Sequence, residues 1–111
     1  MRQVLISLSS FGAAEVRRHG QLWFTRLAQQ AGADGVGVRG ELLVGAAREL
    51  PEVRQAVRSW GGQLVYSSPE PLWNADGSLD FKAVQRAVDA ARLLGAPRLK
   101  MSIGVFRSPA A

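Results

Sequence analysis

Three stretches with the same pattern decide the fold of this chain: AGADGV at residues 31–36, WGGQLV at residues 60–65 and LGAPRL at residues 94–99. In each, a helix-like segment ends at a glycine, which adopts the left-handed helix-ending conformation without steric cost. An apolar segment follows within a few residues. The glycines recur at roughly the 30-residue length of one strand-helix unit. Such units make successive strands parallel, because each helix returns the chain to the same end of the sheet.

The segments around these joints alternate between strand and helix patterns. Runs of branched apolar residues predict strands at residues 3–8, 34–39, 63–67 and 98–103. Apolar residues at helical intervals predict helices at residues 15–31, 41–60 and 80–94. We expect the second of these helices to break at Pro51, since proline lacks an N–H group and clashes inside a helix. The sequence therefore predicts one α/β domain of four parallel βα units (β-α-β-α-β-α-β) over residues 1–107, followed by a tail at residues 108–111.

The predicted third strand leads into a stretch with the composition of a long irregular loop. Residues 68–78 hold two prolines and an Asp-Gly pair, which are turn-forming. Loops of that length inside a compact domain are usually functional. We expect the helix that follows to bury one apolar side, made of Phe81, Val84, Val88, Ala91 and Leu94.

The composition fits a small globular domain and narrows the classes of function. Of the 111 residues, 47% are hydrophobic and 21% are charged, close to average usage. The formal net charge of +5 favours anionic partners such as phosphorylated metabolites. Arginines scattered along the predicted helices equally fit an ordinary solvated surface.

Several kinds of site and location are excluded by what the sequence lacks. The absence of cysteine rules out disulfides, thiolate nucleophiles and cysteine-bound metals. The one histidine, His19, sits in a predicted basic helix without acidic or histidine neighbours at metal-ligand spacing, and we assign it no chemistry. No run approaches the ~20 apolar residues of a membrane span, and the apolar core of the opening segment is too short for a signal peptide. We therefore expect a cytoplasmic protein without a membrane partner.

Two architectures fit the strand order: an open doubly wound sheet, or part of an eight-stranded barrel. The first strand-to-helix loop, SSFGAAEVR, lacks both glycine-rich phosphate cradles, GxGxxG and GxxxxGK[ST], which weakens a nucleotide-binding interpretation. Three stretches favour the barrel: LAQQAGADGVGVRGELL at 27–43, LVYSSPEPLWNADGSLDF at 64–81 and RAVDAARLLGAPRLKMSIG at 86–104. Together they resemble the xylose isomerase-like barrels, a superfamily of sugar and sugar-phosphate isomerases and epimerases.

The resemblance covers nearly the whole chain and implies half of a TIM (βα)8 barrel. In that family a helix ending in AGxDGVE[VL]R enters the second strand, a proline- and aromatic-rich loop follows the third, and an LGAxxLK turn enters the fourth. This chain departs from the pattern at Gly37, where family members usually carry a glutamate. A complete barrel needs roughly 250 residues, so the likeness is to an N-terminal half.

The resemblance also implies a function and a missing catalytic centre. The family's divalent metal, Mn²⁺ or Mg²⁺, is held by residues of later strands, and two of those carboxylates form the acid-base pair. We therefore expect this chain to carry no catalytic residues and no cofactor, to bind a sugar or sugar phosphate, and to be inactive alone. Only the part that shapes the substrate pocket remains.

Barrel active sites lie at the C-terminal ends of the strands, and that rule selects the candidate substrate-binding residues. They are Ser7 and Phe11 after the first strand, Arg39 and Glu41 after the second, Tyr66, Ser68, Glu70 and Trp73 after the third, and Lys100 in the fourth.

Each candidate has a structural alternative. Arg39 could clamp a phosphate through its forked donors, or pair with Glu41. Trp73 could cover the apolar face of a sugar, or pack its own loop. Lys100 belongs to a polar alternation in a strand, which fits a barrel lumen or an edge strand that uses lysine to deter aggregation. The serines could instead cap strand ends.

Two other functions compete with the sugar isomerase half. The first is a non-enzymatic binding or assembly module that forms homodimers or larger homo-oligomers, because half a barrel leaves unpaired edges and, we expect, an uncovered apolar lumen. The second is nucleic-acid binding, motivated by the charge and by the abasic-site endonucleases that belong to the superfamily the sequence resembles. We do not expect it, because the histidine-rich trinuclear metal site of those enzymes cannot be built from one histidine, and the sequence has no aromatic-basic RNA motif.

Overall fold

Four parallel strands form the centre of the structure, a computed structural model in which residues 3–102 are described. They are β1 (Leu5–Ser7), β2 (Gly35–Arg39), β3 (Gln63–Pro71) and β4 (Arg98–Ser102). They lie side by side in chain order, and each neighbouring pair is parallel. The predicted succession of parallel strands is confirmed. Position 103 of the predicted fourth strand and the tail at 108–111 lie outside the described residues.

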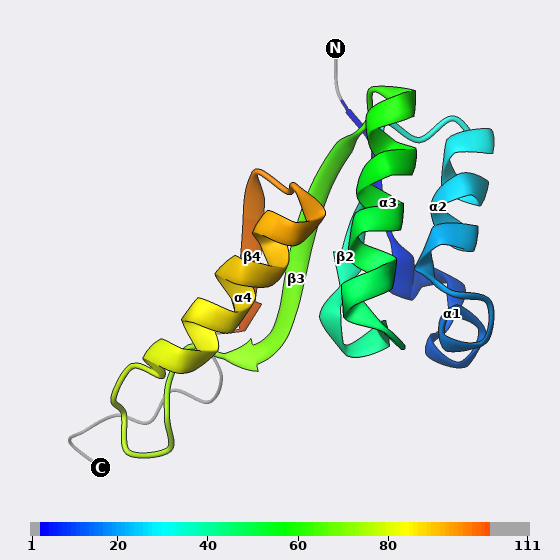
Figure 1. Cartoon of the computed structure of the whole chain (residues 1–111). Helices are drawn as coiled ribbons and strands as arrows, with labels where there is room; N and C mark the ends of the chain where they lie inside the picture. The colour runs from blue at the N-terminus through cyan, green and yellow to red at the C-terminus, as the bar shows by residue number, and fades with distance from the viewer. Residues whose placement is uncertain (1–2, 103–111) are drawn as a thin grey trace.

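The α-helices pack against one another on one side of this sheet. They are α1 (Ala13–His19), α2 (Gln21–Gln30), α3 (Ala46–Trp60) and α4 (Phe81–Leu94), and two short 3₁₀ turns, η1 (Leu8–Phe11) and η2 (Gly40–Leu42), follow β1 and β2. Helix α2 contacts α3, and α3 contacts α4; Figure 1 shows α3 and α4 in front of the strands. Right-handed crossovers between strands in chain order place successive helices on the same face. Within residues 3–102, none of these helices has the length and apolar character needed to cross a bilayer.

The glycines at the three repeated joints behave as the sequence predicts. Gly32, Gly61 and Gly95 have φ angles of +90°, +76° and +74°. At α3 and α4 the glycine is the residue that ends the helix. At α2 the C-cap is Ala31, and Gly32 follows it. A side chain would be strained at a positive φ, so each glycine redirects the chain from the end of a helix toward the next strand.

Two helix predictions are wrong. Residues 15–31 do not form one helix, because Gly20, at φ +86°, separates α1 from α2. The second helix begins later than predicted, at Ala46, and does not break at Pro51. Pro51 is exposed, whereas Leu50 and Val53 beside it are buried. Packing on both sides of the proline therefore outweighs the one helical hydrogen bond that it removes.

The third strand is longer than predicted, and the irregular segment after it is shorter. β3 continues through residues 68–71, and Pro71 pairs with Ser102 after a register shift. The last residue of β3 opposite β2 is Ser67, which pairs with Arg39. Beyond that point β3 has a free side, where prolines are tolerated because no partner strand needs their N–H groups. Trp73 and Leu79 then form an isolated antiparallel bridge.

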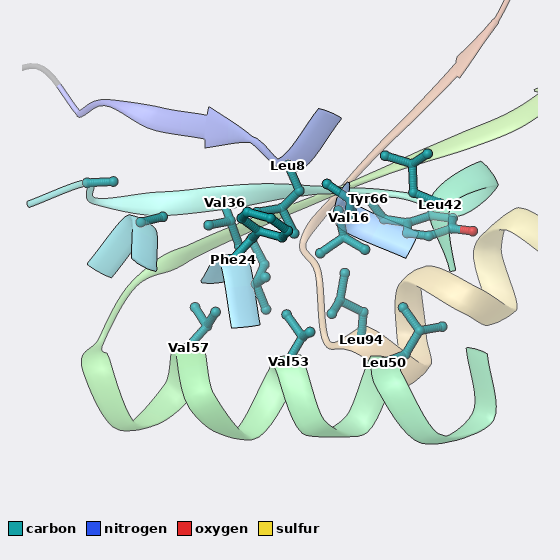
Figure 2. Close-up of a cluster of buried hydrophobic side chains, with 14 of the residues drawn as sticks. Leu8, Val16, Phe24, Val36, Leu42, Leu50, Val53, Val57, Tyr66 and Leu94 are labelled. Atoms are coloured by element: carbon teal, nitrogen blue, oxygen red, sulfur yellow. The ribbon is translucent and has the colours of Figure 1, made fainter. Parts of the chain in front are cut away.

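The core lies between the sheet and the helices (Figure 2). It contains Val36, Val38, Leu64 and Tyr66 from the strands, together with Phe24, Ala28, Leu50, Val53, Val57, Ala91 and Leu94 from the helices. The apolar side predicted for α4 is partly wrong: Ala83, Ala87, Ala91 and Leu94 are buried, but Phe81 is 69% exposed. Asp80 caps this helix by accepting a hydrogen bond from the Ala83 N–H at 3.0 Å. The helix buries the side that carries its alanines, which leaves Phe81 outside.

Candidate functional site

The carboxyl ends of β2, β3 and β4 bring two of the predicted binding residues onto one line. Arg39, Ser67 and Lys100 are register partners on adjacent strands. The row before them consists of Ser7, Gly37, Val65 and Arg98. Because partners in a parallel sheet point to the same face, these two rows project from one side of the sheet.

That side is the one the helices leave uncovered, and we call it the open face: residues Leu5, Ser7, Gly35, Gly37, Arg39, Gln63, Val65, Ser67, Arg98 and Lys100 of the four strands. The alternate strand residues Val36, Val38, Leu64 and Tyr66 are between 0% and 6% exposed, as expected beneath helices. On the open face, Arg98 and Lys100 are exposed, and Arg39, Val65 and Ser67 are half-buried. The predicted alternation in the fourth strand is confirmed. The expected apolar lumen is wrong, because polar and basic side chains dominate this face.

The Arg39 side chain forms an ion pair with Glu41, which the sequence allowed as an alternative to ligand binding. This ion pair engages only part of the guanidinium group. Its Nε donates to Glu41 Oε1 at 2.8 Å. Its two terminal nitrogens have no hydrogen-bond partner among the described residues. Glu41 Oε2 is buried and also has no partner in that part of the chain. The pair therefore orients the guanidinium and leaves its outer fork available.

The backbone of Arg39 is held by Gln21, a residue that the sequence analysis missed. Gln21 is 0% exposed; its Nε2 donates to the Arg39 carbonyl at 2.9 Å, and its Oε1 accepts from the Arg39 N–H at 3.2 Å. Residues of a parallel strand direct both backbone groups to the same neighbour. β1 has already ended at this level, so the Gln21 amide takes the place of a further β1 residue.

Glu49 anchors the same corner from α3. Its side chain is almost fully buried at 3% exposure. One carboxylate oxygen accepts from the Gln21 N–H at 3.3 Å, and the other accepts from the Val44 and Gly45 N–H groups at 2.7 and 3.0 Å. A polar residue at a core position of an amphipathic helix is the signal that could have identified both Gln21 and Glu49 in the sequence.

Tyr66 lies on the covered face, away from Arg39 and Lys100. Its ring belongs to the core, and Figure 2 shows it among the buried side chains. Burial, and then the negative charges of Glu41 and Glu70, raise the pKa of the Tyr66 phenol above 10.0. A Cβ at Gly40 would overlap the Tyr66 hydroxyl and lie 2.7 Å from Pro69 Cδ. The turn after β2 therefore packs directly on β3.

Of the remaining predicted residues, Ser7 lies on the open face one row before Arg39, Ser67 and Lys100, and the others have contacts elsewhere. Phe11 stacks on Phe24 with ring centroids 4.7 Å apart and packs against the core. Ser7 Oγ is 2.9 Å from Ser9 Oγ. Ser68 Oγ accepts from the Glu70 N–H at 3.2 Å, and Glu70 forms an ion pair with Arg86 of α4.

Trp73 and His19 also lie outside the row formed by Arg39, Ser67 and Lys100. Trp73, in the segment after β3, is 42% exposed. The prediction that His19 has no acidic neighbour is wrong, since its Nε2 is 3.4 Å from Glu15 Oε2 one turn earlier. His19 also stacks on Trp23, with ring centroids 4.9 Å apart.

The carboxylates do not fit a metal ion as they are arranged. Glu41, Glu49 and Glu70 are engaged by Arg39, by backbone N–H groups and by Arg86, respectively. Over residues 3–102, no three histidine or acidic side chains come together as a set that could hold a metal.

Neither a protein-family model nor a curated protein matches this sequence. The functional inference therefore depends on the open face, where a sheet with one covered side presents a basic and hydroxyl-bearing row at the ends of its strands.

Proposed function

We propose that this chain is the substrate-binding half of a sugar isomerase-type βα barrel, which binds a sugar or sugar phosphate but does not isomerise it alone. The observation that carries the proposal is the register that sets Arg39, Ser67 and Lys100 side by side. In a βα barrel, the face opposite the helices lines the lumen, and substrates bind at the carboxyl ends of the strands.

The chemistry of this row suits a polyhydroxylated or phosphorylated ligand. Arginine and lysine donate charge-assisted hydrogen bonds to oxyanions and hydroxyls, and Ser67 adds a hydroxyl that is half-buried. In the xylose isomerase-like barrels that the sequence resembles, the divalent metal and the acid-base carboxylates belong to later strands. Residues 3–102 would therefore bind without turnover.

Turnover and binding should be measured on the same preparation. A panel of aldoses, ketoses and their phosphates is incubated with the 111-residue chain and Mn²⁺ or Mg²⁺, and amide NMR spectra are recorded during titration with the same compounds. We expect no detectable isomerisation and shifts confined to the amides near Arg39, Ser67 and Lys100. Isomerisation by the pure chain, or shifts located on the helices instead, would refute the proposal.

The alternative function, a self-associating module, is favoured by one observation. Within the described sheet, β1 and β4 each pair with a single neighbour, so each leaves an edge that another strand could join. The basic character of the open face disfavours direct face-to-face pairing of two copies, because it would oppose like charges. Pairing of the free β1 or β4 edge with an edge of a second copy is the remaining route. Sedimentation over a range of protein concentrations tests it, and a monomer throughout would count against self-association.

A further inference from the structure

We infer that the open face contains a binding site for a phosphate-type oxyanion, held between Arg39 and Lys100 above Ser67, with Arg98 supplying a third positive charge. This inference rests on the proposed function and deepens it, since it selects phosphorylated ligands over neutral sugars. It also adds Arg98 to the binding residues.

The register fixes the dimensions of this site. Adjacent strands are about 4.8 Å apart, so the Cα atoms of Arg39 and Lys100 are separated by about 10 Å with Ser67 between them. Arg98 lies two residues before Lys100 on the same strand and face, about 7 Å away along the chain. Arginine and lysine side chains are long enough to converge on one tetrahedral anion across that distance. Ser67 Oγ, which has no partner among the described residues, faces the same space.

The sheet surface next to the proposed site carries no side chain at position 37, which is a glycine. Gly37 occupies the row before Arg39, and a Cβ built there would meet only Ser7 Cα, at 3.6 Å. A side chain at this position would fit, so glycine is not required here by packing within the described residues. Its effect is to leave open space beside the guanidinium, through which a ligand could approach the β2 backbone.

Two of the three positive charges on this face, those of Arg98 and Lys100, lack a counter-charge among residues 3–102, whereas Arg39 is paired with Glu41. No strand residue of the open face within residues 3–102 is acidic. Lys100 and Arg98 form no ion pair in that range, and Glu41 occupies only the Nε of Arg39. Neighbouring positive charges within about 10 Å repel one another unless solvent or an anion screens them. A bound oxyanion would remove that repulsion and use donors that are already oriented.

Two other occupants fit this face less well. Single-stranded nucleic acid needs a basic track with aromatic platforms, but the described strand residues of the open face include no aromatic side chain. A second copy would present the same positive charges. Two unpaired cations and the outer fork of Arg39, grouped around one serine, match a single phosphate group in size and charge.

The test titrates the 15N-labelled chain with inorganic phosphate, with a hexose monophosphate and with the same unphosphorylated hexose, at low and high salt. We compare Arg39→Gln and Lys100→Gln with two control variants, Arg48→Gln and Lys82→Gln, which remove the same charges from exposed helix positions. Loss of a charge-assisted hydrogen bond should weaken phosphate affinity about tenfold. The control variants should change it less than about twofold, as expected for diffuse electrostatics.

Each outcome has a defined meaning. Lys100→Arg should retain most of the binding, and the amide spectrum of every variant reports whether it is folded. Equal weakening by the control variants, or unchanged affinity in Arg39→Gln and Lys100→Gln, would overturn the oxyanion site. Phosphate binding that the sugar moiety does not improve would support the site and refute the sugar function. Equal affinity for the hexose and its phosphate, without binding of inorganic phosphate, would refute the site and leave the sugar function standing.

Discussion

The two faces of the same four-stranded sheet differ in almost every physical property. The covered face consists of branched and aromatic side chains that the helices bury, such as Val36, Val38 and Leu64. The open face consists of glycine, serine, glutamine and basic residues, with Leu5 and Val65 as the apolar side chains among its described strand residues. Burial of apolar area stabilises the first face. The second contributes little to stability and is free to carry ligand contacts.

This difference separates the residues that hold the fold from those that could perform a function. Arg39 links the two faces, because Gln21 holds its backbone from the covered side while its side chain belongs to the open face. Stability and binding should therefore respond to different substitutions, which mutational measurements can check.

The largest effect is expected from truncation in the core. Leu50→Ala removes a side chain that is 1% exposed, and should lower the free energy of unfolding by about 2–5 kcal/mol. Val65→Ala, on the open face, should cost about 1 kcal/mol or less, because Val65 is already half-exposed. Urea denaturation of both variants measures the difference. Equal losses would mean that the open face is covered in solution.

A smaller effect is expected from the buried amide. Gln21→Leu keeps most of the side-chain volume but leaves the Arg39 N–H and carbonyl without their partner, which should cost about 1–3 kcal/mol. Gln29→Leu, at an exposed position of the same helix, is the matched control and should have almost no effect. If Gln21→Leu proves as stable as the control, water must replace the amide, and the link between the two faces is looser than the distances indicate.

The smallest effect is a dependence of stability on alkaline pH. The pKa of Tyr66 is raised in the folded chain, first by burial and then by Glu41 and Glu70, so the unfolded chain loses this proton at lower pH. The stabilisation is fully present below the ordinary phenol pKa of 10.0, and is lost as pH rises through the higher folded value. Tyr66→Phe should remove this component from the unfolding free energy measured across that range.

The same titration can be followed directly. Tyr66 is the only tyrosine in the sequence, so the ultraviolet absorbance of phenolate reports this residue alone. A midpoint at or below the ordinary value in the folded chain would contradict the position of Tyr66 beside the two glutamates.

The sequence predicted those features that depend on local chemistry. Glycine joints, branched apolar runs and helical periodicity were sufficient to place four strands and their parallel order. Proline was the main source of error. Pro51 was expected to break the second helix, and Pro69 and Pro71 were expected to lie in a loop. Tertiary structure accommodates all three prolines. Core packing on both sides of Pro51 keeps the helix intact, and Pro69 and Pro71 lie where one side of the strand has no partner strand.

For the candidate site, sequence reasoning found the charges but not what holds them. The alternation of Arg98, Lys100 and Ser102 with apolar residues was visible in the fourth strand, and the rule about strand ends selected Arg39. The register that makes Arg39, Ser67 and Lys100 neighbours depends on how long each strand runs, which the sequence does not fix. Gln21 and Glu49 were missed because polar residues on an apolar helix side acquire meaning only from the backbone groups that they meet.

Gly40 sets a limit on how this chain could change. Its neighbours leave no room for even one methyl group, because a Cβ at position 40 would lie 2.7 Å from Pro69 Cδ. An alanine at this position would separate the carboxyl ends of β2 and β3, since Tyr66 or Pro69 would have to move. In a saturation library selected for solubility or ligand affinity, this position should be among the least permissive, although it is neither charged nor part of the binding row.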